Sequence, residues 1–261
     1  MATRVKPDPL LQMAGLSKTY EQGRWWEKQF HLKALDGVDL SLEEGKTLAL
    51  VGKSGSGKTT LAMCAALLEL PDSGKIWFNG RDVMSLDKRE RALLRPRIQI
   101  IFQDSTALPA RYTARQIIEE PLEIQRRYAP KERAELVSEL MEKVGLSAKW
   151  GNRLPNQFSG GQRQRLAVAR ALTLQPRLLI LDEPFVGLDI STRGQIINLL
   201  LDLQAENSLT YLYISHDLEL LRHFADSVAL MDQGKITEQV GVSDLFRSPE
   251  DARTRALASA F

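Results

Sequence analysis

Short apolar runs alternate with amphipathic segments along most of this chain. Apolar runs too short for a helix predict buried strands, at 38–42, 47–51, 76–78, 97–102, 178–181, 210–214, 227–231 and 235–238. Apolar residues at helical spacing predict helices, at 61–70, 113–120, 130–144, 159–174, 191–203 and 218–225. Strands that alternate with helices are typical of an α/β fold with a parallel sheet.

The pattern changes in the middle of the chain. Between 104 and 158 the strand signals stop, and two helices are predicted there, the second opened by Pro130 and ended by Gly145. We therefore predict a single domain over 1–261, in which 1–103 and 159–261 form the sheet-containing core and 104–158 is a helical insertion. The charged and aromatic residues at 21–31 predict an inserted loop.

Composition excludes several classes of protein. The 261 residues are 43% hydrophobic and 26% charged, which suits a globular domain with a sizeable core. Lys+Arg of 35 against Asp+Glu of 33 give a net charge of +2 without a dense basic stripe, which argues against a nucleic-acid partner. The single cysteine, Cys64, excludes an internal disulfide framework. No signal peptide and no apolar run near the ~20 residues of a membrane span are present, so we expect a cytoplasmic chain.

Residues 52–59 carry the strongest chemical signal. Gly-Lys-Ser-Gly-Ser-Gly-Lys-Thr fits the phosphate-binding pattern G-x-x-x-x-G-K-[ST], between a predicted strand and a predicted helix. Glycines let backbone N–H groups close around a triphosphate, Lys58 can reach the outer phosphates, and the Thr59 hydroxyl can ligate Mg²⁺. The predicted nucleotide-binding residues are Gly52, Ser54, Gly55, Ser56, Gly57, Lys58, Thr59 and Thr60. The alternative is a glycine-rich turn with an accidental Lys-Thr.

Two adjacent carboxylates, Asp182 and Glu183, leave the buried strand at 178–181. In an open α/β sheet, the carboxyl ends of the strands are where ligands bind. We expect Asp182 to hold Mg²⁺ through water and Glu183 to take a proton from an attacking water. An acidic strand exit with no function is the alternative, and the phosphate loop in the same chain argues against it.

A second anion-binding signal lies at 156–165, Asn-Gln-Phe-Ser-Gly-Gly-Gln-Arg-Gln-Arg, where Ser159 and two glycines open a helix. With this run the chain resembles the nucleotide-binding subunits of ABC transporters, whose signature is Leu-Ser-Gly-Gly-Gln; Phe158 replaces the leucine. The resemblance extends from about Leu10 to Leu245 by motif coverage. It implies a P-loop NTPase (RecA-like) core with an antiparallel β subdomain and an inserted helical subdomain, and it implies ATP and Mg²⁺ as ligands.

The resemblance also implies roles for further residues. In that family two subunits meet head to tail, so one protomer would offer Ser159, Gly160, Gly161, Gln162 and Asp189 to the ATP held by its partner. Gln103 looks like the glutamine that contacts Mg²⁺ and links the site to the membrane partner. His216 looks like the switch histidine at the terminal phosphate, catalytic together with Glu183 and Lys58; a structural histidine is the alternative. Tyr20 resembles the aromatic that stacks on adenine, and a plain strand-end tyrosine is its alternative.

Finer features resemble the oligopeptide, dipeptide and nickel importer branch, including Phe102-Gln103-Asp104 and Arg163-Gln164-Arg165. Members pair two ATPase subunits with permease subunits and an external solute-binding protein, which implies a peripheral position at the cytoplasmic face of the cell membrane. The run 105–111 and the Val186-Gly187 pair depart from the branch pattern. A soluble ABC ATPase in a multiprotein complex and an exporter ATPase are the other two readings, because all share these motifs.

Overall fold

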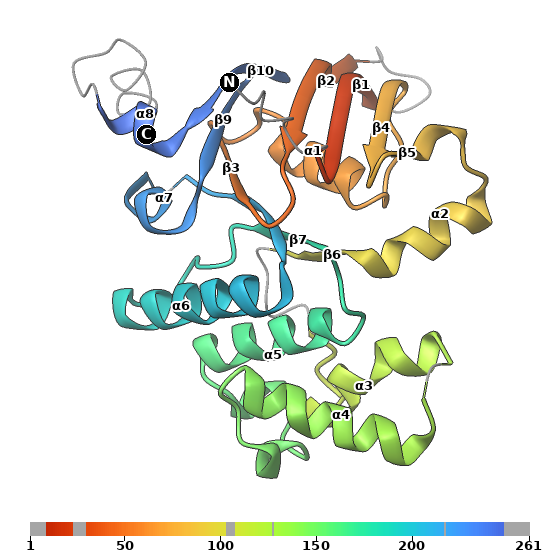
Figure 1. Cartoon of the computed structure of the whole chain (residues 1–261), viewed down its shortest axis with the longest axis vertical. Helices are drawn as coiled ribbons and strands as arrows, with labels where there is room; N and C mark the ends of the chain where they lie inside the picture. Colours follow the sequence, from red (N-terminus) through yellow and green to blue (C-terminus); the bar gives the residue numbers. More distant parts are fainter. Residues whose placement is uncertain (1–8, 23–29, 103–107, 127, 217, 248–261) are drawn as a thin grey trace, which may run out of the picture.

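The computed structural model describes residues 9–22, 30–102, 108–126, 128–216 and 218–247 of the chain. These residues form two sheets and several helices. In Figure 1 the four-stranded antiparallel sheet lies at the upper right, and helices α3, α4 and α5 occupy the lower half. The phosphate-loop segment and its helix α1 lie beside the antiparallel sheet.

The larger sheet has six strands in the order β10-β9-β3-β8-β7-β6. Their bounds are β3 Thr47–Val51, β6 Ile98–Ile101, β7 Leu178–Asp182, β8 Thr210–Ile214, β9 Ser227–Asp232 and β10 Lys235–Gly241. Strands β3, β6, β7, β8 and β9 run parallel, and β10 pairs antiparallel with β9. Each of these strands was predicted from its apolar run. Because parallel strands share a direction, β3, β6, β7 and β8 all end at one edge of the sheet.

Side chains of these strands divide between two hydrophobic cores. In β3, Leu48 and Leu50 pack into the core on one face, and Ala49 and Val51 into the core on the other. Residues of β7 and β8 alternate in the same way, so the sheet is buried on both sides. Each fully buried aliphatic side chain contributes about 1.5–3 kcal/mol, which makes a one-residue slip of register costly.

The predicted helices are present with shifted ends, as α1 Lys58–Ala65, α3 Ala114–Ile124, α4 Pro130–Lys143, α5 Gly160–Leu172, α6 Ile190–Asn207 and α7 Leu218–Phe224. The expectation of a helix over 61–70 was wrong at its end. The chain leaves α1 after Ala65, and Leu67 adopts a positive φ of 55°. Apolar residues continue to Leu70, so the sequence carries no stop signal before Pro71.

The smaller sheet has the order β2-β1-β4-β5, with β1 Leu11–Gln22, β2 Phe30–Leu42, β4 Ser73–Phe78 and β5 Arg81–Asp82. Strand β1 was not predicted. Its pairing with β2 shifts between Met13 and Leu16, around Gly15 at φ 61°, and this irregularity interrupts the two-residue period. The loop expected at 21–31 was wrong at both ends, because Glu21 pairs with His31 inside the sheet; residues 23–29, with Trp25 and Trp26, lie outside the described residues.

Two short helices, α2 Lys88–Leu94 and α8 Val242–Arg247, were also missed. Helix α2 buries none of its residues, so it shows no apolar stripe. A local signal was nevertheless present: Asp87 and Glu90 form a capping box, with the Asp87 carboxylate accepting from the backbone N–H groups of Arg89 and Glu90.

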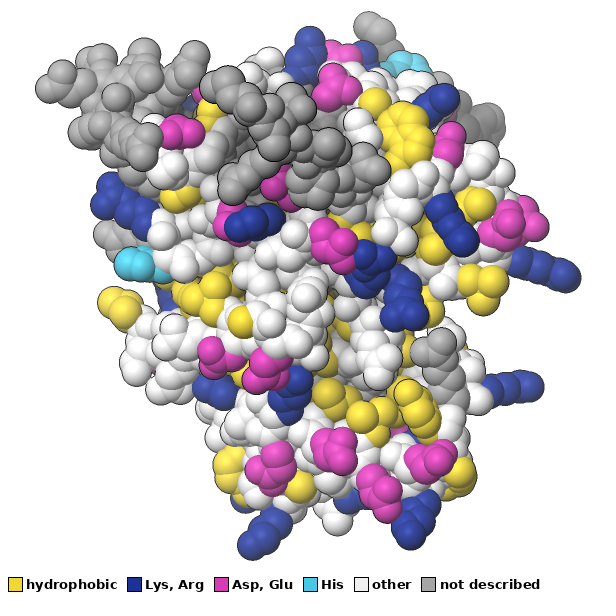
Figure 2. Space-filling view, in the orientation of Figure 1, with side chains coloured by type: hydrophobic (Ala, Val, Ile, Leu, Met, Phe, Trp, Pro, Cys, Tyr) yellow, Lys and Arg dark blue, Asp and Glu magenta, His cyan; other side chains and the backbone are white. Residues whose placement is uncertain are grey.

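From 108 to 158, the described residues contain α3, α4 and single turns of 3₁₀ helix at Ala148–Trp150 and Pro155–Gln157, with no strand. Two other 3₁₀ turns, Val83–Ser85 and Arg95–Arg97, flank α2. Figure 2 shows acidic and basic side chains interspersed over one face, in keeping with the balanced charge. Within the described part of the chain, no helix combines the length and apolar character needed to cross a bilayer.

Candidate functional site

The phosphate loop, residues 52–57, joins the end of β3 to the start of α1 and is pressed against two neighbouring backbones. A Cβ on Gly52 would overlap the carbonyl oxygen of Met231 in β9, and one on Gly57 would overlap that of Ala34 in β2. Gly55 and Gly57 have positive φ angles of 77° and 108°. The loop therefore needs glycine both for its conformation and for its close packing.

Lys58 begins α1, and its ammonium group turns back into the curve of the loop. Nζ donates to the carbonyl oxygens of Gly52 at 2.7 Å and Lys53 at 2.8 Å. Lys58 is 8% exposed; burial lowers its pKa, while the carboxylates of Glu183 and Asp182 act in the opposite direction. The loop thus holds a cationic group next to the acidic strand end.

Ser56 is buried in the same loop. Its backbone N–H donates to Lys53 at 3.1 Å and its carbonyl accepts from Gly234 at 2.9 Å, but among the described residues its hydroxyl has no hydrogen-bond partner. An unpaired buried hydroxyl costs about 1–3 kcal/mol. A polar ligand in the loop would remove this cost. Ser54 and Gly55, by contrast, lie exposed.

Asp182, the last residue of β7, contacts Thr59, the second residue of α1. Thr59 Oγ1 donates to Asp182 Oδ2 at 3.3 Å. Burial raises the pKa of Asp182, against the opposing effects of the Thr59 hydroxyl and the Lys58 charge. A hydroxyl and a carboxylate that converge in this way are oxygen donors of the kind that hard divalent cations take.

Glu183 and His216 come from neighbouring strand ends. Glu183 has a positive φ of 49°, and its backbone N–H donates to the carbonyl of Ile214 in β8 at 3.0 Å. His216 Nδ1 lies 3.4 Å from Glu183 Oε1, and the two side chains are 59% and 21% exposed. A pocket of about 40 Å³ adjoins them, lined also by Arg193 and Val186. A solvent-accessible carboxylate beside a histidine can accept a proton from water.

The run 159–162 opens helix α5. Ser159 caps it: its Oγ accepts from Gln162 N–H at 3.3 Å, while Gln162 Oε1 accepts from Ser159 N–H at 3.0 Å. Gly160 and Gly161 let this helix lie directly against the start of α6. A Cβ on Gly160 would come within 3.1 Å of Leu188 Cδ2, and one on Gly161 would overlap the Thr192 methyl group.

Asp189 caps α6 beside this contact. Its Oδ1 accepts from Thr192 N–H at 2.9 Å and its Oδ2 from Thr192 Oγ1 at 2.6 Å. These bonds lower the pKa of the Asp189 carboxyl. Thr192 therefore joins the Asp189 loop to the helix that begins at Gly160.

The structure brings only some of the predicted residues together. Lys58, Thr59, Asp182, Glu183 and His216 meet at one sheet edge. None of the hydrogen bonds or ion pairs of the described residues joins 159–162 or Asp189 to the phosphate loop. Tyr20 lies near the end of β1, and its hydroxyl donates to Glu69 at 2.5 Å. Burial and the Glu69 bond raise the pKa of Tyr20, and the neighbouring Thr60 hydroxyl acts in the opposite direction. Gln103 and the departing run from 105 to 107 lie outside the described residues.

Two residues at the site were not predicted. Arg193 lines the pocket of Glu183 and His216, and its Nε donates to the Leu188 carbonyl at 2.8 Å. Glu69 holds the Tyr20 hydroxyl. Both contacts depend on tertiary packing, and no local spacing in the sequence indicates either one.

Several known proteins are similar to this chain in sequence. A family model described as ABC transporter matches residues 35–186. The chain is 45% identical to the dipeptide transport ATP-binding protein DppF of Haemophilus influenzae, with 100% of this chain and 80% of that protein covered. It is 43% identical to the oligopeptide transport ATP-binding protein AppF of Bacillus subtilis, with 98% and 79% covered.

Solved structures of ATP-binding cassettes have a similar fold. The fold is similar to the ATP-binding cassette MJ0796 in a dimeric post-hydrolysis state bound to ADP and Pi, with a TM-score of 0.77, 30% identity, and coverage of 89% of this chain and 98% of that chain. It is also similar to cbiO1 from Clostridium perfringens, part of the ABC transporter complex cbiONQ, with a TM-score of 0.80, 26% identity and 96% of each chain covered.

The contact between Gly161 and Thr192 predicts opposite effects for two Gly→Ala substitutions. Gly161→Ala should destabilise the fold by about 1–2 kcal/mol, because the overlap with Thr192 outweighs the gain in helix propensity. Gly194→Ala, at an open position of α6, should stabilise it by about 0.5–1 kcal/mol. Urea unfolding of both variants measures the difference.

Thr192→Ser removes the methyl group and keeps the hydroxyl that binds Asp189. In that background Gly161→Ala should no longer destabilise. If Gly161→Ala remains equally harmful there, the overlap is not its cause.

Proposed function

This chain belongs to the ABC transporter family, and we propose that it is the ATP-hydrolysing subunit that powers uptake of peptides, or of a related small solute such as nickel or a metal chelate, through partner permeases. The observation that carries the proposal is the meeting of Thr59 with Asp182, and of Glu183 with His216, beside the phosphate loop. The peptide class is supported by the dipeptide and oligopeptide transport relatives, which align with nearly the whole chain.

One ABC ATPase domain would then occupy 1–261. Residues 1–103 and 159–261 form its ATP-binding core and β subdomain, and 104–158 its helical subdomain. The change from sheet to helices in the described residues supports these boundaries.

The loop geometry supports ATP binding. Gly52, Ser54, Gly55, Ser56 and Gly57 surround the phosphates, with Thr60 just beyond them in α1. Among the described residues the Ser56 hydroxyl has no hydrogen-bond partner, and the buried Lys58 ammonium donates to two neutral carbonyl oxygens; both groups fit a polyanion, because a phosphate would accept from each of them. Tyr20 stacks on the adenine ring.

Mg²⁺ fits the same edge. The Thr59 hydroxyl and the Asp182 carboxylate, 3.3 Å apart, are oxygen donors, and the resemblance adds Gln103. When bound, the ion neutralises charge on the phosphates. Asp182 would hold the ion through water. This carboxylate is buried, and the charge of Lys58 acts on it.

We assign the hydrolysis step to Glu183 and His216. Glu183 orients a water molecule and takes its proton, because its partly exposed carboxylate follows Asp182 directly at the end of β7. His216 contacts the terminal phosphate and, through Nδ1, fixes the carboxylate. Lys58 stabilises the negative charge that develops on the transferred group.

A second ATPase protomer completes the site. Ser159, Gly160, Gly161, Gln162 and Asp189 have no bond to their own phosphate loop, and in a head-to-tail dimer they would face that of the partner. Val186 and Ile190, 49% and 87% exposed, flank Asp189 and would be covered in such a dimer. The similar cassette MJ0796 is dimeric, which supports a dimer for this chain. The partner protomer is a second copy or a related chain.

The permease would dock on the helical side. A groove of about 280 Å³ lies between β6, α3 and α5, lined by Ile100, Phe102, Pro121, Ile124 and Arg170. Ile124 and Phe102 are exposed there. A groove with these exposed apolar side chains suits a short helix of a membrane subunit, and such docking would put the chain at the cytoplasmic face of the membrane. An external solute-binding protein would act upstream.

Glu183→Gln should retain ATP binding and lose turnover by about 10²–10⁴-fold, because the amide cannot accept the proton of water. Equilibrium binding and phosphate release measure the two properties, with Glu206→Gln, a distant exposed carboxylate, as the control. Near-normal turnover would remove Glu183 from the role of base.

Thr59→Val should weaken Mg²⁺-dependent ATP binding by about 10–100-fold, since it deletes one oxygen donor and keeps the shape. Binding measured in EDTA should stay close to that of the unchanged chain. Thr237→Val, an exposed position on β10, is the matched control. Equal losses with and without Mg²⁺ would contradict a role as metal ligand.

Affinity purification of this chain from its native membrane in gentle detergent tests the transport assignment. We expect permease subunits, a second ATPase and a peptide-binding protein to co-purify, identified by mass spectrometry. Recovery of soluble enzymes alone would refute the importer, and permeases with no solute-binding protein and outward transport in vesicles would indicate an exporter.

A further inference from the structure

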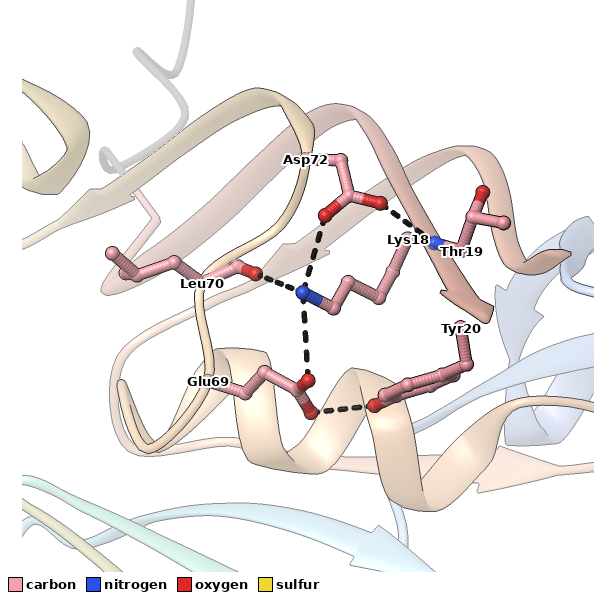
Figure 3. Close-up of polar contacts among 6 residues, drawn as sticks. All are labelled: Lys18, Thr19, Tyr20, Glu69, Leu70 and Asp72. Atoms are coloured by element: carbon pink, nitrogen blue, oxygen red, sulfur yellow. Dashed lines mark hydrogen bonds and ion pairs between the residues drawn. The ribbon is translucent and has the colours of Figure 1, made fainter. Parts of the chain in front are cut away.

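A cluster of charged residues joins the end of β1 to the segment that follows α1. Lys18 Nζ donates to the Leu70 carbonyl at 3.0 Å and to Asp72 Oδ1 at 3.1 Å, and it lies 3.4 Å from Glu69 Oε1. Figure 3 shows Lys18 at the centre of these partners. The lysine side chain is only 16% exposed, so the ion pairs are shielded from water more than ordinary surface pairs.

Backbone bonds fix this cluster in place. Thr19 N–H donates to Asp72 Oδ2 at 2.7 Å, and Asp72 N–H donates to the Ser17 carbonyl at 2.8 Å. Burial by itself lowers the pKa of Lys18, but the carboxylates of Asp72 and Glu69 outweigh it and the net shift is upward. Lys18 is therefore a fixed cation, and Glu69 is held by it.

Glu69 connects the charged cluster to Tyr20. The Tyr20 hydroxyl donates to Glu69 Oε2 at 2.5 Å, so one carboxylate oxygen faces Lys18 and the other faces the tyrosine (Figure 3). The Lys18 ammonium also lies 5.8 Å from the centroid of the Tyr20 ring. The torsion that turns a tyrosine ring is broad in energy, and a charge-assisted bond at the far end of the ring restricts it.

We propose that Glu69, held by Lys18, is a positioning residue that fixes the plane of the Tyr20 ring for stacking on the base of ATP. The inference rests on the proposed function, in which Tyr20 is the adenine-stacking residue. The base stacks on the ring face turned away from Lys18. Because the ring is already oriented, binding the base costs less conformational freedom.

The geometry separates two contributions to nucleotide affinity. The phosphates meet the loop and the start of α1, and the base meets Tyr20. Glu69 binds Tyr20 from the segment after α1, outside the loop, while the Thr60 hydroxyl neighbours Tyr20 at the start of α1. Loss of Glu69 should therefore weaken binding of a nucleotide and leave binding of a bare polyphosphate unchanged.

Binding of ATP and of inorganic tripolyphosphate to the purified full chain tests this inference. Tyr20→Ala should weaken ATP binding by about 10-fold or more, since stacking on an aromatic ring supports each base substantially. Glu69→Ala and Tyr20→Phe should each weaken it by about 3–10-fold, which is less than one charge-assisted bond contributes, because the ring stays in place and loses only its fixed plane. Tripolyphosphate affinity should not change in any of them, and Glu135→Gln, on the exposed face of α4, is the control.

The double variant Tyr20→Phe/Glu69→Ala should bind ATP no more weakly than either single variant, because both remove the same bond. If Tyr20→Ala leaves ATP affinity unchanged, the stacking role in the proposed function fails. If Tyr20→Ala weakens binding while Tyr20→Phe and Glu69→Ala match the unchanged chain, stacking stands and the positioning role of Glu69 is overturned. Equal weakening of tripolyphosphate by Glu69→Ala also overturns it, since that result indicates a structural change in the loop.

Discussion

The parallel sheet is buried on both faces, and the candidate site depends on this constraint. Alternate side chains of β3, β7 and β8 enter opposite cores, so none of these strands can slip by one residue without exposing apolar surface. The ends of these strands are therefore fixed relative to one another. Thr59 follows β3, Asp182 ends β7 and His216 follows β8, so the shared edge of these strands brings the three residues to one place.

The positions of the residues that meet at this edge could be predicted from the sequence, because these residues stand in short local patterns. Lys58 and Thr59 follow from glycine spacing, and Asp182 from a strand of uninterrupted apolar residues. The position of Glu183 was predicted, but its left-handed backbone was not, because it depends on the bond to Ile214. Similarly, β1 was hidden by the bulge around Gly15, and the end of α1 depends on how Leu67 packs.

Contacts between distant segments explain the rest. The bond from Tyr20 to Glu69 spans 49 positions in the sequence, and neither residue type indicates the other. The packing of Gly161 against Thr192 likewise joins two helices that the sequence predicts separately. Through Thr192, this packing connects the start of α5 to the Asp189 cap.

The backbone of Glu183 has a consequence for how this chain could evolve. A non-glycine residue at φ 49° costs about 1 kcal/mol relative to glycine or asparagine at the same position. A chain shaped by folding stability alone would carry one of those residues here. The proposed catalytic use of this glutamate and its thermodynamic preference thus act in opposite directions, and variants that gain stability at 183 are expected among those that have lost their activity.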